Sequence, residues 1–287
     1  MTHPQKTVEK SAVRQTTVTE SVAWIDRIPR PVAMVLLMVI FLLLWQLVYE
    51  LRLISPIILS TPLETIYDLF YVGKNILSGD YMLVALWVTT QEVLLGFAIA
   101  IALGFLLGLL VGETAFGERA VLPYLVAINA MPKVAFAPLF VSWLGFGIAS
   151  KVALSSFIAI FPVIVGTAAG LHATDENERM LFRTMGATRW QTLVKLKLPT
   201  GMPHFFAGLK NAAVLVVVGA VVGEFLGGGK GFGELIRVAA SQLNTPRVFS
   251  LIIYLSFLGL ATFWAVIWLQ HKLVFWHKET VAEQTFE

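Results

Sequence analysis

Six long apolar runs constrain the fold of this chain more than any other feature of its sequence. They cover about residues 32–49, 85–111, 120–142, 152–171, 207–226 and 249–270. A helix that crosses a bilayer needs roughly 20 apolar residues. Charged residues make up only 14% of the chain, whereas soluble domains carry about 25%. The sequence therefore predicts an all-α polytopic membrane protein with about six transmembrane helices.

The first and third runs each raise a further question. The first follows Arg27 and Arg30 and lacks a small-residue cleavage pattern, so we expect an uncleaved span and not a signal peptide. The third contains Pro123, Pro132 and Pro138. Proline at membrane depth is tolerated only where neighbours or water satisfy the freed backbone groups. This run is therefore either one span or a broken, partly re-entrant one.

The distribution of Lys and Arg predicts the orientation in the membrane, because cytoplasmic loops carry an excess of these residues. With the N-terminus inside, most of them fall in inside segments, Lys6, Lys10, Arg14 and Lys278 among them. The outside segments hold only Arg52, Lys74, Lys151, Lys230, Arg237 and Arg247. We therefore expect both termini in the cytoplasm.

Two outside segments have a recognisable character. Between residues 50 and 84, Leu63, Ile66, Leu69 and Phe70 recur at helical spacing, which predicts an amphipathic helix at the membrane interface. The run "GGGKGFGE", residues 227–234, is not a P-loop, because Lys230 is followed by glycine and not by Ser or Thr. We expect a flexible loop there, and the chain shows no site for ATP.

Small residues repeat at a strict stride of four along the second run. A stride of four keeps one helix face nearly bare and lets another helix approach closely. The sequence therefore predicts tight helix packing along this face. The residues are Gly96, Ala100, Gly104, Gly108 and Gly112.

Four ionisable residues lie in or beside the apolar runs: Glu92, Lys133, Lys210 and Glu224. A charge at the bilayer centre costs about 2.5–3.5 kcal/mol on insertion scales, so each is a functional candidate. We expect Glu92 at the interface and Lys210 snorkelling to the inside surface. Lys133, after Pro132, either snorkels or faces an aqueous cavity at a helix break. Pro132, Lys133 and Glu224 are the candidates for a translocation path or gate.

Residues that could carry catalysis or hold a metal form no recognisable set. The chain has no cysteine, and the histidines lie at the termini or at the ends of the runs without an H-E-x-x-H pattern. Ser155 and Ser156 lack a G-x-S-x-G context. We predict no catalytic, cofactor-binding or metal-binding residue. The small net charge of +3 gives no support for nucleic acid binding.

The longest inside connection, residues 172–206, contains the basic stretch "MGATRWQTLVKLKLP" from Met185 to Pro199. Helical spacing before and after Gly186 predicts a helix, a glycine turn and a second helix, which Pro199 would end by removing a donor. Such a loop could bind anionic lipid headgroups. Its compact shape indicates instead a docking site for a cytosolic partner.

The spacing of Gly186, Ala187, Leu198 and Pro199 resembles the "EAA" loop of bacterial ABC-transporter permeases. "MPKVAFAPLFVSWLGFG" (131–147), "GLKNAAVLVVVGAVVGEFLG" (208–227) and "GFGELI" (231–236) resemble permeases of the nitrate, sulfonate and taurine importer group. Within that group, "LWVTTQEVLLGFAIA" and "ASQLNTPRVFSLIIYLSFLG" are most similar to permeases for thiamine-pyrimidine precursors or riboflavin.

The chain departs from the family pattern at the positions that give the loop its name. Where the family has Glu-Ala-Ala, this chain has Met180, Leu181 and Phe182, so a contact made by the family's glutamate cannot be transferred. We therefore expect other residues of the loop, before the turn and in its second helix, to contact an ATPase. They are Glu178, Arg179, Arg183 and Trp190, beside Gly186, Ala187, Leu198 and Pro199.

The resemblance implies a type I ABC importer permease fold in a bacterial plasma membrane. It implies a permease homodimer, two cytosolic ATPase subunits that hold ATP and Mg²⁺, an external or lipid-anchored binding protein, and surrounding membrane lipid. The expected organisation is a tail (1–31), a first span with the external segment (32–83), the permease core (84–271) with its coupling loop (172–206), and a tail (272–287). The alternative is a self-sufficient secondary carrier.

Overall fold

The computed structural model describes residues 29–55 and 57–276. Several Lys and Arg residues on which the predicted orientation depends lie outside the described residues, namely Lys6, Lys10, Arg14, Arg27 and Lys278. In the described part the chain forms α-helices with three short 3₁₀ or π segments. The elements are α1 Arg30–Glu50, α2 Pro62–Leu77, α3 Tyr81–Glu113, η2 Gly117–Val121, α4 Leu122–Ala130, η3 Lys133–Phe136, α5 Ala137–Leu144, α6 Ile148–His172, α7 Glu176–Thr184, α8 Arg189–Thr192, η4 Leu193–Lys197, α9 Leu198–Gly227, α10 Phe232–Ser241 and α11 Thr245–Leu273.

The expected spanning segments are confirmed as helices. Within the described residues, five stretches are long and apolar enough to cross a membrane, namely Pro31–Glu50, Tyr81–Glu113, Ile148–His172, Arg189–Gly227 and Thr245–Leu273. The sixth is the proline-rich run, which forms two pieces, Gly117–Ala130 and Lys133–Leu144, bent by 87°. The break falls at Met131, whose extended backbone is the conformation favoured for a residue before proline. Of the two alternatives for this run, the broken one is correct.

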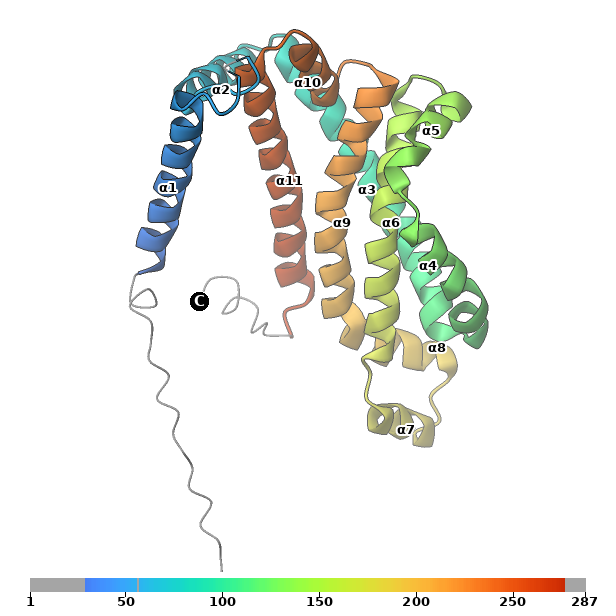
Figure 1. Ribbon diagram of the computed structural model, residues 1–287. Coiled ribbons are helices and arrows are strands. Elements are labelled where there is room, and N and C mark those ends of the chain that lie inside the picture. Colours follow the sequence, from blue (N-terminus) through green and yellow to red (C-terminus); the bar gives the residue numbers. More distant parts are fainter. Residues whose placement is uncertain (1–28, 56, 277–287) are drawn as a thin grey trace, which may run out of the picture.

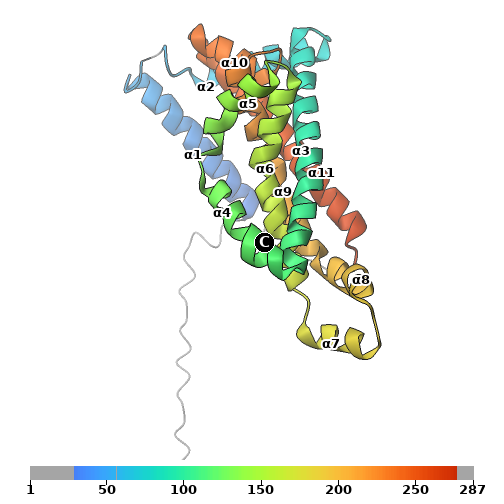
Figure 2. The same cartoon turned by 90° about the vertical axis from the view of Figure 1, so that its right-hand side faces the viewer.

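Three helices form the centre of the molecule. Helix α6 packs along both α3 and α9, and the buried side chains between them are mostly small, such as Ala159, Ala212 and Ala213. The loop bearing α7 lies at one end of these helices, and α10 and α5 lie at the other (Figure 1, Figure 2). We call these two ends the α7 end and the α10 end.

Helix α2 lies across the α10 end and packs on α11 (Figure 1). An ion pair of 2.8 Å between Asp68 on α2 and Arg247 on α11 holds the two together. The helix expected in this region is confirmed, and its position at the membrane interface stays a prediction. Its buried face includes Thr65 and Val72, and the expected apolar residues Leu63, Ile66 and Phe70 are exposed.

Helix α1 stands apart from the other spans, and none of its apolar window is buried (Figure 1). Only its end near α2 is fixed. The Trp45 indole donates to the carbonyl oxygen of Ser60 at 2.9 Å and its ring lies 5.2 Å from that of Phe249. The rest of this apolar helix is available to lipid or to another protein chain.

The glycine-rich segment is more ordered than expected. Residues 232–241 form helix α10, and Gly231 and Gly233 lie so close to Glu224 that a Cβ at either position would clash with its carboxylate. The prediction of a flexible loop was therefore wrong for this part. These two glycines allow the backbone to approach the buried side chain of Glu224 closely.

Candidate functional site

The loop between α6 and α9 begins with a well-defined helix and turn. Helix α7 is capped by Asp175, whose carboxylate accepts from the backbone N–H of Asn177 at 2.8 Å. It ends in a Schellman motif, in which the N–H of Ala187 donates to Phe182 and that of Gly186 to Arg183, each at 3.0 Å. Gly186 has φ +75°, a left-handed conformation that glycine adopts without steric cost.

A second capping motif starts the next helix. The Thr188 hydroxyl accepts from the N–H of Gln191 at 3.2 Å, and the Gln191 side chain accepts from the N–H of Thr188 at 2.8 Å. This is the capping box, T-x-x-Q, and its sequence pattern could have located the helix start. The helix–turn–helix expectation for this loop is therefore confirmed.

The expectation that Pro199 ends the second helix was wrong. Helical structure continues from Arg189 to Gly227 as a single 39-residue stretch. The π-helical segment η4, residues 193–197, immediately precedes the proline, which occupies the first turn of α9. In the π segment the hydrogen bonds run from i to i+5, and the N–H of Leu198 donates to the carbonyl of Leu193. Pro199, which has no N–H, follows directly where this pattern ends, so the helix passes the proline without a break.

The exposed surface of this loop combines charged and polar side chains with several large apolar ones. Met180, Met185 and Trp190 are 55%, 74% and 70% exposed, and Leu181 is also exposed. Helix α7 and the turn after it project beyond the ends of the spans in both views (Figure 1, Figure 2). Large apolar side chains exposed together outside the spans are typical of a protein interaction site.

The polar residues expected in the loop differ in position. Glu178 and Arg183 are exposed. Arg179 turns back toward α6, where it donates to the carbonyl oxygens of Leu171 at 3.3 Å and His172 at 3.5 Å. It therefore fixes α7 to the end of α6.

Leu198 and Pro199 are half-buried at the start of α9, and Ala187 is half-buried in the turn. The structure therefore does not bring Leu198 and Pro199 to the exposed turn with Gly186 and Trp190.

The small-residue row on α3 lies against α6. A Cβ on Gly104 would be 2.6 Å from Cβ of Val163, and one on Gly108 would be 2.9 Å from the carbonyl oxygen of Ile164. The same holds along the row for Gly96 beside Ser155 and Gly112 beside Leu171, and Ala100 is fully buried.

A second set of glycines, which the sequence analysis missed, joins α6 to α9. Gly166 faces Gly208, and Gly170 faces Gly201, so that the two backbones are almost in contact. Sequence spacing alone could have indicated them, because Gly166 and Gly170 repeat at four and Gly201 and Gly208 at seven. Together the two sets make α3, α6 and α9 one tightly packed unit.

Lys133 lies at the break between α4 and η3. Its ammonium donates to the side-chain oxygen of Asn129 at 2.6 Å and contacts the carbonyl oxygen of Ile158 at 3.5 Å. Its nitrogen is 5.7 Å from the centroid of the Phe161 ring. Since Ile158 and Phe161 lie near the middle of α6, Lys133 is at mid-depth and does not snorkel to a surface.

Glu224 is fully buried near the α10 end, whereas Lys133 lies beside the middle of α6. Its carboxylate accepts from the Thr89 hydroxyl at 2.7 Å and from the N–H of Gly233. The Thr89 hydroxyl also accepts from the N–H of Phe232 at 2.9 Å. Glu224 therefore ties α9 to α3 and α10, and its burial gives no support to its prediction as a path residue.

Two further charges join Glu224 inside the bundle. Glu92 and Lys151 are 0% and 3% exposed and pair at 3.5 Å, and the Glu224 carboxylate lies near both. Glu92, expected at the interface, is thus buried among helices, and Lys151, counted among the outside residues, is buried in the first turn of α6. The burial of an ionisable side chain depends on partners from other helices, and a local sequence pattern does not reveal those partners. We call Glu92, Lys151 and Glu224 the buried charge cluster.

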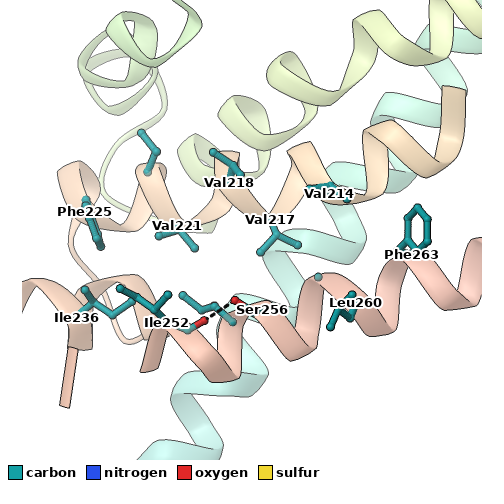
Figure 3. A pocket seen from close by; sticks show the side chains of 13 residues that line it. Val214, Val217, Val218, Val221, Phe225, Ile236, Ile252, Ser256, Leu260 and Phe263 are labelled. Atoms are coloured by element: carbon teal, nitrogen blue, oxygen red, sulfur yellow. Dashed lines mark hydrogen bonds between the residues drawn. The ribbon is translucent and has the colours of Figure 1, made fainter. Parts of the chain in front are cut away.

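A groove of about 700 Å³ lies between α9 and α11 beside α10 (Figure 3). Its walls are Val, Leu, Ile and Phe side chains, including Val218 and Phe225. The Ser256 hydroxyl is satisfied within its own helix, where it donates to the carbonyl oxygen of Ile252 at 2.9 Å. Such walls suit hydrocarbon and offer little to hold a polar solute.

Comparison with known proteins gives consistent results. Residues 100–274 match the family described as binding-protein-dependent transport system inner membrane component. The chain is 37% identical to a formylaminopyrimidine transport permease of Halalkalibacterium halodurans, over 84% of the chain and 95% of that protein. It is 34% identical to a riboflavin transport system permease of Chloroflexus aurantiacus, over 55% and 59%. It is 30% identical to an aliphatic sulfonates transport permease of Bacillus subtilis, over 84% and 86%.

Proposed function

Because this chain belongs to the family of binding-protein-dependent transport system inner membrane components, it is a multi-pass permease subunit of an ABC importer, and we propose that it imports a small solute of the formylaminopyrimidine type. The relative with that printed substrate is 37% identical and is covered over 95% of its length. Nitrate, sulfonates and taurine, which name other relatives, are the second candidate class.

We infer that the α7–α8 loop couples this chain to a cytosolic ATPase. The observation that carries the proposal is the exposed apolar knob formed by Met180, Met185 and Trp190 outside the spans. Helix α8 continues through η4 into α9, so a displacement of the knob moves a spanning helix directly. An ion pair of 2.7 Å between Lys197 and Glu113 connects the same segment to α3.

ATP and Mg²⁺ would be held by the ATPase chains, and this chain would act without a cofactor and without catalysis of its own. The family implies an ATPase and a substrate-binding protein as partners. We propose that the complex contains two copies of this permease. We also propose that the α7 end and both termini face the cytoplasm, so that the α10 end meets the binding protein.

We propose that the solute passes along the face formed by α4, η3 and α5. Irregular backbone at membrane depth is tolerated only where it is covered by protein or lines water. The break at Met131–Pro132 has exposed residues on both sides, including Val134. A second copy opposite this face would enclose the path between the two.

The test is reconstitution in liposomes of the permease with its ATPase and binding protein. The expected result is uptake of radiolabelled formylaminopyrimidine that requires ATP and all three proteins. Taurine and nitrate, assayed in parallel, decide between the two substrate classes. Uptake by the permease chain alone, without ATPase or binding protein, would identify a secondary carrier and overturn the proposal.

A further inference from the structure

Lys133 is an unusual residue in its surroundings because it carries a cationic group at mid-depth. Its nitrogen is 3.5 Å from the carbonyl oxygen of Ile158, near the midpoint of α6. Within residues 29–55 and 57–276, no carboxylate pairs with it. The buried charge cluster shows the opposite arrangement, because Lys151 there has Glu92 beside it.

A lysine at this depth cannot face hydrocarbon without cost. Insertion scales put the penalty at about 2.5–3.5 kcal/mol, and lysines in spans therefore face water, protein or a ligand. The backbone next to Lys133 gives an independent reason to exclude lipid, because the break at Met131 leaves peptide groups outside regular helix. Both features indicate that this surface is wet or covered by protein.

The groups that Lys133 and Asn129 present are hydrogen-bond donors. An ammonium has three donors and no acceptor, and two of those of Lys133 are directed at Asn129 at 2.6 Å and at the carbonyl oxygen of Ile158 at 3.5 Å. What remains is the third donor of Lys133 and the amide NH₂ of Asn129. These donors, beside a positive charge, are complementary to carbonyl, ring-nitrogen or anionic oxygen acceptors. The half-buried Phe161 ring adds an apolar wall beside it.

We propose that Lys133 and Asn129 form a mid-depth binding site in the translocation path for a solute group that offers hydrogen-bond acceptors, either neutral or anionic. This inference rests on the proposed path along α4, η3 and α5. It assigns Lys133 a direct contact with the solute during passage and predicts that the site rejects cationic groups.

The first experiment uses the absence of native cysteine in this chain. Ala130, exposed at the end of α4, is replaced in the variant Ala130→Cys. The thiol is treated with an anionic methanethiosulfonate (sulfonatoethyl) and a cationic one (trimethylammonioethyl), in the assembled complex. We expect both reagents to react, and Lys133→Met in the same background to lower the ratio of anionic to cationic rates severalfold. Leu37→Cys on the exposed face of α1 is the lipid-facing control and should stay unmodified.

The second experiment measures uptake of formylaminopyrimidine by the reconstituted complex. Lys133→Met should lower the uptake rate roughly tenfold, as expected for one lost charge-assisted hydrogen bond. Lys133→Arg, which keeps the charge, should restore most of it. Lys74→Met, an exposed lysine on α2, is the matched control and should leave uptake unchanged.

The outcomes separate this inference from the proposed function. If the wild-type complex takes up no probe, the proposed function fails, while the reagent ratio still reports on the site. If wild-type uptake is ATP-dependent but Lys133→Met leaves both uptake and the reagent ratio unchanged, the inference is overturned and Lys133 only stabilises the break. If Ala130→Cys reacts with neither reagent, the site is not aqueous and the inference is likewise overturned.

Discussion

At the scale of single residues, burial of charge determines much of this structure. Lys151 and Glu92 pair inside the bundle, and Glu92 has no hydrogen-bond partner for either carboxylate oxygen among the described residues. Breaking one member of a buried pair is more costly than replacing both, because the other charge is left uncompensated.

Lys151→Met should therefore lower the free energy of unfolding by about 3–5 kcal/mol, since Glu92 stays buried without its partner. The double variant Lys151→Met/Glu92→Met should regain part of that loss, because Glu224 also loses the nearby lysine but keeps its hydrogen bonds with Thr89 and Gly233. Thermal unfolding of the purified protein in detergent measures both. If the double variant is no more stable than Lys151→Met alone, the pair does not act as a unit.

Glycine contacts are the second residue-level feature. Gly104→Val should destabilise the protein by about 1–3 kcal/mol, because the added side chain overlaps Val163 on α6. Ala102→Val, on the exposed face of the same helix, is the matched control and should be near neutral. Equal shifts of the unfolding midpoint for the two variants would contradict close packing along this row.

The two residue-level features differ in how well the sequence predicts them. A stride of four maps directly onto one helix face, so the spacing alone places the row from Gly96 to Gly112 on a packing surface. The pair of Glu92 and Lys151 could not be predicted in this way, because about 60 residues separate its members and neither sits in a periodic pattern. Long-range partners of this kind depend on how whole helices pack, and a local pattern contains no information about it.

At the scale of elements, the α7–α8 turn is specified residue by residue. Asp175, Gly186 and the pair Thr188–Gln191 each satisfy backbone groups at a helix end. The turn was therefore predictable, whereas the continuation past Pro199 was not. The π segment formed by the residues before Pro199 compensates for the hydrogen bond that proline cannot make. A rule that considers proline alone does not predict this compensation.

Gly186→Leu should uncouple ATP hydrolysis from uptake while the protein stays in the membrane. A left-handed conformation costs a side-chain-bearing residue about 1–2 kcal/mol, so the turn would change shape. Gly186→Asn, which tolerates this conformation better, should keep most activity. Solute taken up per ATP hydrolysed is the measurement, and a normal ratio for Gly186→Leu would show that the turn does not transmit the motion.

At the scale of the whole molecule, the described residues leave helix α1 and the broken span uncovered. Helix α1 buries none of its apolar window, and the face of α4, η3 and α5 exposes a broken span. The sequence predicted about six spans and left open whether the third is one span or a broken one. It could not predict that α1 stands apart, because its apolar composition is the same as that of a span buried in a bundle.

Because we propose a second copy opposite the broken span, we expect residues at the break to cross-link between the two chains. Met131→Cys, 46% exposed at the break, should form a disulfide-linked dimer under mild oxidation in membranes. Leu106→Cys, exposed on α3, is the control and should remain monomeric on a denaturing gel. Cross-linking of both variants to the same extent, or of neither, would argue against a dimer built on this face.

The buried pair of Glu92 and Lys151 also has a consequence for how the protein is made. Chains are synthesised from the N-terminus at about 5–20 residues per second, so roughly 3–12 s pass between the two residues. Helix α3 therefore reaches the insertion machinery before the residue that neutralises Glu92 exists. Glu92 therefore enters the membrane without Lys151, carried by an apolar helix, and the two residues pair inside the bundle once α6 packs against α3.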